Sequence, residues 1–341
     1  MKHFIINRNM ATFLKGIAII LMIIHHSFGF PEWYIDNISY IFLTKYIYFF
    51  RVSIYFLIVP MFAFLTGWSY FYHKDKSYKY SLKKIIKFLI SYWIVYLLLL
   101  FIALSVNSYE INFFKILLSL FGVNGEIMIF SWYVNFYILV MLFLPTYNKF
   151  IGKDNFLMDL LIIVSLSIFI KIILKITINN IILANFSTYL PSVMMGYLCA
   201  KYNILDIIYN YILYRFKDKS KKISVILTFV LIIIYSIKPV LIINFGAFYV
   251  PLFLVCMSIL NIYKYKVFNK IIAFLGSQSM NIWFIHCIFF APLTKQVFQP
   301  MAFIFENPIL VLIWILIVCS FISIFLSKIQ NKMNNALEKF L

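Results

Sequence analysis

Apolar residues run through this chain in long unbroken stretches, separated by short polar segments that carry most of its charge. The stretches are close to the roughly 20 residues that an α-helix needs to cross the hydrocarbon core of a bilayer. A membrane β-barrel would instead show short segments of alternating hydrophobicity. The pattern predicts an all-α, polytopic membrane protein of about ten transmembrane helices, near residues 12–30, 52–72, 85–106, 127–146, 157–174, 186–200, 223–243, 246–263, 271–293 and 308–327.

Two further stretches, 38–51 and 204–214, are amphipathic and are expected to lie at the membrane interface. The longest hydrophilic segment, 201–222, is too short to fold as a soluble domain. The first apolar run ends without the small residues of a cleavage site, so we expect a retained first helix. We therefore expect a single integral-membrane domain over residues 1–341.

The composition agrees with this pattern, because 64% of the residues are hydrophobic and only 12% are charged. Such a chain lacks the polar side chains that would cover a water-facing surface. The net charge of +19 is typical of nucleic-acid binding in a soluble protein. Here most of the 30 basic residues fall in alternate loops, which favours cytoplasmic N- and C-termini and no nucleic-acid partner.

The first apolar stretch contains three ionisable residues, Lys15, His25 and His26. Such residues are unfavourable inside a membrane and by default indicate a functional site. Lys15 and His26 are about three helical turns apart, so they share one face of the helix. His25 points away from this face and is expected to pack against another helix or to orient its neighbour. Two structural alternatives stay open: Lys15 as a snorkelling anchor, and His26 as a hydrogen-bonding group between helices.

Imidazole is suited to proton transfer near neutral pH because its ordinary pKa lies close to that range. His26 has few rivals, since all eleven acidic residues fall in loops or at helix ends. The four cysteines lie inside apolar stretches without ligand spacing, so no metal site is expected. Phosphate-loop, zinc-protease, nucleophile-elbow and dinucleotide motifs do not occur in the sequence.

Three other segments place polar residues inside apolar stretches. Ser279 and His286 are seven residues apart in the ninth stretch and share a helix face, and Asn281 lies between them. This patch predicts either a second wall of the same cavity or polar contacts that hold helices together. Thr66 lies before a glycine that allows close helix packing, and Trp132 fits an aromatic belt.

Several segments, taken in chain order, carry a resemblance to a known family: Leu14–His26, Val59–Gly67, Leu82–Trp93, Trp132–Tyr133 and Ser279–His286. The chain resembles the acyltransferase-3 family of bacterial integral-membrane O-acyltransferases, whose first helix carries a basic residue, usually Arg, and then His. Lys15 and His26 stand at these positions, and Thr66 stands where the family usually has Ser. Lysine keeps the charge but does not bind phosphate or carboxylate in the bidentate manner of arginine. The resemblance covers nearly the whole chain.

The resemblance implies a multi-pass enzyme of the bacterial plasma membrane. This enzyme would be an acyltransferase that transfers groups other than aminoacyl groups. An acyl group, expected to be acetyl, would pass from acyl-CoA to a hydroxyl of a cell-surface or lipid-linked glycan. Acetyl-CoA or another acyl-CoA would act as donor substrate, and no tightly bound cofactor is expected. His26 would be the general base or would take the acyl group transiently, and Lys15 would bind the donor. The remaining candidates for the substrate cavity are His25, Thr66, Trp132, Ser279, Asn281 and His286.

Two alternatives come from other functional classes. A transporter or flippase of a lipid-linked glycan would share the ten helices and a cationic cavity. The sequence shows neither an internal repeat nor a buried carboxylate relay, and both absences count against it. A sensor or assembly scaffold without catalysis would leave Lys15 and His26 unexplained.

Overall fold

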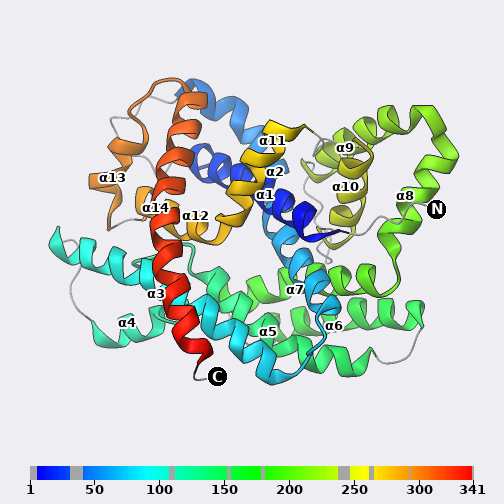
Figure 1. The fold of residues 1–341 in the computed structure, drawn as a ribbon, viewed down its shortest axis with the longest axis horizontal. Coiled ribbons are helices and arrows are strands. Elements are labelled where there is room, and N and C mark those ends of the chain that lie inside the picture. The colour runs from blue at the N-terminus through cyan, green and yellow to red at the C-terminus, as the bar shows by residue number, and fades with distance from the viewer. Residues whose placement is uncertain are drawn as a thin grey trace. The chain divides into compact units, whose positions relative to one another are not determined.

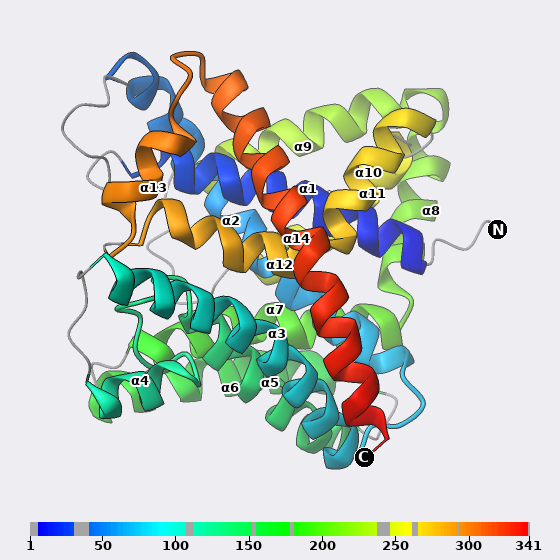
Figure 2. The same ribbon diagram turned by 60° about the vertical axis from the view of Figure 1, so that its left-hand side comes forward.

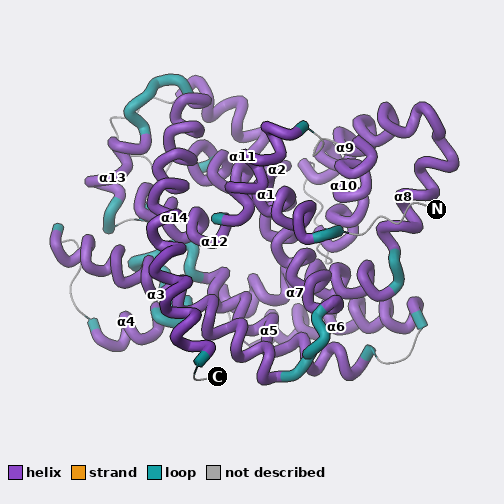
Figure 3. Tube along the Cα trace, in the orientation of Figure 1, coloured by secondary structure: helices purple, strands orange, loops and turns teal. Residues whose placement is uncertain are grey.

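The computed structural model describes residues 6–30, 41–106, 112–151, 155–177, 181–236, 246–260, 265–291 and 293–339. Throughout these ranges the regular elements are helices, which make up 85% of the structure, and the described residues contain no strand (Figure 3). The fold class is therefore all-α, as the apolar pattern predicts. The chain divides into two units, and each is assembled from segments that are distant in sequence.

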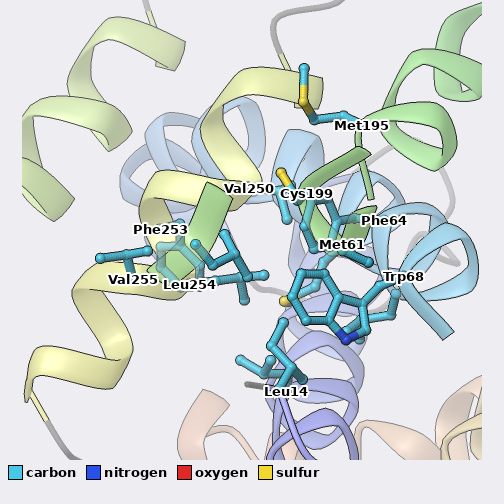
Figure 4. Close-up of a cluster of buried hydrophobic side chains, with 14 of the residues drawn as sticks. Leu14, Met61, Phe64, Trp68, Met195, Cys199, Val250, Phe253, Leu254 and Val255 are labelled. Atoms are coloured by element: carbon cyan, nitrogen blue, oxygen red, sulfur yellow. The ribbon is translucent and has the colours of Figure 1, made fainter. Parts of the chain in front are cut away.

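The first unit comprises residues 1–18, 51–76 and 143–276. Its helices are the first part of α1 (Arg8–Phe28), most of α2 (Ile41–Tyr72), the end of α5 (Trp132–Phe150), α6 (Phe156–Thr177), α7 (Ile181–Lys201), α8 (Ile204–Phe216), η2 (Lys217–Lys219), α9 (Ser220–Ser236), α10 (Gly246–Leu260) and α11 (Lys266–Ser277). Helix α10 packs against α7, α8 and α9. A cluster of buried side chains that includes Leu14, Phe64, Trp68 and Leu254 forms the core of this unit (Figure 4).

Two glycines set the close approach of α2 and α7 in the first unit. A β-carbon on Gly67 would lie 1.9 Å from the carbonyl oxygen of Val193, and one on Gly196 would lie 2.1 Å from that of Phe64. Small residues at a helix crossing allow the backbones to meet, which favours packing where lipid supplies no hydrophobic driving force.

The second unit comprises residues 19–50, 77–142 and 277–341. Besides parts of α1, α2 and α5, it contains α3 (Tyr78–Ser105), α4 (Phe113–Ser119), α12 (Ser279–Ile285), η4 (His286–Phe289), α13 (Lys295–Ala302) and α14 (Pro308–Glu338). Helix α14 runs beside both α12 and α3 (Figures 1 and 2). These three helices carry most of the polar side chains considered below.

Local sequence fixes where the two long helices of the second unit begin. The Ser77 hydroxyl accepts a hydrogen bond from the backbone N–H of Tyr80 at the start of α3. The Asn307 side chain accepts from the N–H groups of Ile309 and Leu310 at the start of α14, and Pro308 occupies the first helical position. Both are preferred capping arrangements, since they satisfy N–H groups that have no partner within the helix.

The helices follow most of the predicted stretches, with two corrections. The fourth stretch was expected to be helical from residue 127, but 127–131 form a turn and α5 begins at Trp132. The ninth was expected to be continuous over 271–293, but it breaks at Gln278 into α11 and α12. Residues 41–51 form the first part of α2, and their expected position at the membrane interface stays a prediction. Residues 38–40, 237–243, 261–263 and 292 of the predicted segments lie outside the described residues.

Among the described residues, α1, α3 and α14 are long and apolar enough to cross a bilayer. A fourth span is added if the broken pair formed by α11 and α12 with η4 counts as one. These helices support an integral membrane protein with several spans. The number of ten spans and the cytoplasmic placement of both termini stay predictions.

Candidate active site

Two buried histidines from distant parts of the sequence meet in the second unit. His26 lies in the last turn of α1, and His286 is the first residue of η4. The Nδ1 atom of His26 is 2.7 Å from the Nε2 atom of His286, and the two rings are inclined by only 3°. Their exposed fractions are 7% and 0%. A short N···N distance between parallel rings is the geometry of a hydrogen bond between imidazoles.

The surroundings of His286 determine which nitrogen of each ring carries its proton. The Nδ1 atom of His286 is 3.2 Å from the carbonyl oxygen of Ile282. A carbonyl oxygen only accepts, so the proton of neutral His286 belongs on Nδ1 and its Nε2 is an acceptor. Nδ1–H of His26 must then donate to that acceptor. This assignment places the lone pair of His26 on Nε2, which is the atom that can take a proton or attack a carbonyl.

The ring of Phe130 covers the histidine pair. It is stacked on His26 at a centroid distance of 3.9 Å and an angle of 10°, and it lies 5.1 Å from the ring of His286 at 8°. The ring of His25 also lies close to the pair. Its centroid is 5.3 Å from that of His26 and 4.9 Å from that of Phe30. The apolar rings exclude water from the pair and restrict its rotation.

The segment that carries Phe130 depends on Gly122. This glycine has a φ of +73°, and a β-carbon on it would lie 2.4 Å from the carbonyl oxygen of Ser131. Only glycine adopts this conformation without strain and permits so close an approach. Helix α3 fixes the preceding residues, because the Tyr92 hydroxyl donates to the carbonyl of Ser119 (2.7 Å) and the Trp93 indole N–H to that of Leu120 (2.8 Å).

A cavity of about 420 Å³ lies within the second unit, beside the start of α12. Two cations of α3, Lys84 and Lys87, line it together with the aromatic residues Phe88 and Tyr137. Its remaining lining is mostly amide and hydroxyl side chains from α3, the α11–α12 junction and α14, namely Ser91, Ser277, Gln278, Asn281, Ser327, Gln330, Asn331 and Asn334, with Met280. We call this cavity the lysine–amide pocket. Cations, hydrogen-bonding groups and aromatic faces together fit a polar anionic ligand.

A hydrogen-bond network joins α12 to α14 at this pocket. Asn281 and Gln330 exchange two amide hydrogen bonds, of 3.0 and 2.6 Å. Asn281 also donates to the hydroxyl of Ser327 (3.0 Å), which in turn donates to the side chain of Gln278 (2.7 Å). Both amides of the central pair are buried, so the network holds two helices together and also forms a polar wall of the pocket.

The structure brings His26 and His286 into direct contact, with His25 next to them. Asn281 lines the lysine–amide pocket, whereas Ser279 is buried at the start of α12 and is not part of the pocket lining. Trp132 begins α5, packs edge-on against Tyr133 and is half-buried. The chemical roles of these residues stay predictions.

Lys15 and Thr66 belong to the first unit. Lys15 is half-buried in α1, which is continuous from Arg8 to Phe28, so the helix that its spacing from His26 assumes does form. The Thr66 hydroxyl donates to the carbonyl of Phe62 within α2 (2.9 Å). This bond lies within α2, and the expected place of Thr66 in the substrate cavity stays a prediction.

Sequence reasoning missed Phe130 and the amides of α14. Phe130 lies in a turn that was expected to be helix, and its only signal was the aromatic run that it forms with Trp132 and Tyr133. Gln330 and Asn334 lie beyond the last predicted span, where the polar composition suggested only a tail. In the described part of the chain, no group of three His, Cys, Asp or Glu side chains is placed to hold a metal ion.

Asp159 lies at a helix end, as expected for the acidic residues, and is also buried. It lies in the first turn of α6, and its carboxylate is buried and accepts hydrogen bonds from Lys201 Nζ (3.0 Å) and the Tyr202 hydroxyl (2.6 Å). Lys201 also donates to the carbonyl of Ile151 (2.9 Å). These contacts join the start of α6 to the end of α7 and to the residue that follows α5 in the first unit. The ion pair therefore has a structural role.

A buried pair of hydrogen-bonded imidazoles is suited to acid–base or covalent catalysis. Comparison with protein families gives the reaction class. The family model described as an acyltransferase domain matches residues 11–328, nearly the whole chain, and the protein belongs to the acyltransferase-3 family. No curated protein and no solved structure matches the chain.

Proposed function

We propose that this protein is a membrane-bound O-acyltransferase of the bacterial plasma membrane. It moves an acyl group, expected to be acetyl, from acyl-CoA to a hydroxyl of a cell-surface or lipid-linked glycan. The proposal includes about ten spans with both termini in the cytoplasm, as the charge distribution favours. The observation that carries it is the His26–His286 pair inside a chain of the acyltransferase-3 family.

The proposed reaction starts with proton transfer. His26 Nε2 takes the proton of the acceptor hydroxyl while the oxygen of that hydroxyl attacks the thioester carbonyl of the donor. The C–S bond then breaks, and the CoA thiolate leaves with the proton from His26. His286 supports this step because its Nε2 accepts the hydrogen bond from His26 Nδ1–H, which strengthens when His26 becomes cationic. In the alternative order, His26 Nε2 takes the acyl group first and passes it to the hydroxyl.

The lysine–amide pocket is the proposed site of the polar part of the donor. CoA carries phosphates that suit Lys84 and Lys87, an adenine ring that suits Phe88 and Tyr137, and amides that suit the side chains of α14. Asn281 lines this pocket and His286 follows five residues later, about 7.5 Å further along a helical rise of 1.5 Å per residue. Lys15 is proposed to steer the anionic donor from the cytoplasmic side.

The experiment is acetyl transfer by the purified protein in detergent. Release of free CoA from acetyl-CoA is followed with a thiol reagent, with the wild type and the His26→Ala variant in parallel. His73→Ala is the matched control, because His73 lies in the exposed turn after α2. We expect loss of transfer in His26→Ala alone. Normal transfer by His26→Ala would overturn the mechanism, and a transporter would release no CoA without a sealed bilayer.

The acceptor is identified separately, by mass spectrometry of envelope glycans from cells with and without the protein. A mass difference of one acetyl group on a glycan is the expected result. A different mass difference would identify another acyl group. Unchanged glycans in cells that contain active enzyme would contradict a glycan acceptor.

A further inference from the structure

Helix α14 continues beyond the part of the chain that matches the family. The match ends at residue 328, but α14 runs without interruption to Glu338. We call residues 329–338 the α14 extension. Gln330, Asn331 and Asn334 of this extension line the lysine–amide pocket.

The extension also places a carboxylate against one of the pocket lysines. Glu338 forms an ion pair with Lys87, and the two side chains are 50% and 28% exposed. None of the residues that line the pocket is acidic, whereas two of them are lysines. Glu338 is therefore the negative group that contacts the cationic side of the pocket from α14, at a place where an anionic ligand would bind.

Asn334 provides an independent sign of a ligand. Its Oδ1 atom is buried and accepts no hydrogen bond from any of the residues that the structure describes. Buried acceptors are normally satisfied, because loss of hydration without a partner is unfavourable. An acceptor of this kind on the wall of a cavity fits an N–H or O–H group of a bound molecule. CoA offers such groups in its adenine amine, its hydroxyls and its pantetheine amides.

We propose that the α14 extension completes the donor site and sets its affinity. Asn334 accepts a hydrogen bond from the bound donor, and Glu338 neutralises Lys87 until a phosphate of the donor displaces it. This inference rests on the proposed function, since it takes acyl-CoA as the occupant of the pocket. It adds two residues with opposite effects: Asn334 strengthens donor binding, and Glu338 weakens it by competing for Lys87.

The test is the dissociation constant of CoA for the purified full-length protein, measured by calorimetry in low salt. Glu338→Gln removes the competing charge, and we expect binding to tighten by about two- to fivefold, as suits a partly exposed ion pair. Asn334→Ala removes the acceptor, and we expect binding to weaken by roughly three- to tenfold. Glu306→Gln is the matched control, because it makes the same charge change at the exposed turn before α14. We expect less than about a 1.5-fold change there.

A fourth variant separates this inference from the proposed function. Lys84→Gln/Lys87→Gln removes both cations, and we expect CoA binding to weaken at least about tenfold. If this variant binds CoA like the wild type, the pocket is not the donor site. If it binds weakly while Glu338→Gln and Asn334→Ala match Glu306→Gln, the donor site stands and the role of the extension is wrong. Thermal unfolding of each variant shows that the binding changes are measured on folded protein.

Discussion

Replacing His286 by leucine or by glutamine separates its chemical role from its packing role. Leucine removes the acceptor of the hydrogen bond from His26 Nδ1–H, which is 2.7 Å long in the native pair. Glutamine can place an amide oxygen near the position of Nε2 and still accept that bond. Both side chains are similar to histidine in volume, so they fill the buried site beneath Phe130.

The expected effect follows from the charge that forms on His26 during proton transfer. A hydrogen bond to a charged group contributes about 1.5–3 kcal/mol, more than one to a neutral group. Losing it in the transition state slows acyl transfer by roughly 10- to 150-fold. His286→Leu is therefore expected to lower kcat by that factor with little change in the KM for acetyl-CoA. His286→Gln should stay within about tenfold of the wild type, since an acceptor remains.

The assay is steady-state acetyl transfer by purified protein in detergent, which gives kcat and the KM for acetyl-CoA, with thermal unfolding as the measure of folding. A folded His286→Leu variant with native kcat would refute the role of the pair. So would equal losses in the leucine and glutamine variants, because packing alone would then explain the site. A change confined to KM would place His286 in donor binding instead.

Three further substitutions test contacts that stabilise the two units, with thermal or chemical unfolding in detergent as the measurement. Gly122→Ala forces a left-handed φ on a residue with a β-carbon, and we expect about 1–2 kcal/mol of destabilisation or more, with reduced transfer because the segment carrying the stacked phenylalanine shifts. Asn281→Ala leaves the buried amide of Gln330 without its main partner, and we expect about 1–3 kcal/mol of destabilisation. Asp159→Asn leaves Lys201 without its counter-charge, and we expect about 3–5 kcal/mol of destabilisation, relieved in part by Lys201→Met. Unchanged unfolding in any of these variants would contradict the corresponding contact.

Apolar length predicted the helical class and most helix positions, because a lipid-facing backbone has to satisfy its hydrogen bonds within a helix. The break at Gln278 was beyond this reasoning. The stretch around it is apolar enough for one span, and neither proline nor a run of glycines marks an interruption there. The turn before Trp132 was missed for the same reason, since hydropathy does not distinguish a buried turn from a helix.

The candidate site was predicted in its parts and not in its arrangement. Ionisable residues inside apolar stretches identified His26 and His286 as candidates, and helical spacing placed Ser279 on the same face as His286. Their pairing depends on how α1 meets η4 across most of the chain length, which no local pattern encodes. Phe130 was missed because an aromatic residue in an apolar stretch carries no distinguishing chemistry until its neighbours in space are known.

The line of hydrogen bonds that begins at His26 ends at the carbonyl oxygen of Ile282. A carbonyl oxygen does not take up protons under these conditions, so among the residues that the structure describes no hydrogen-bonded group follows His286 to receive a proton shared by the two rings. It must leave through the same nitrogen of His26 by which it entered. In the proposed reaction, the proton that His26 takes from the acceptor hydroxyl therefore returns from the same Nε2 atom to the leaving thiolate.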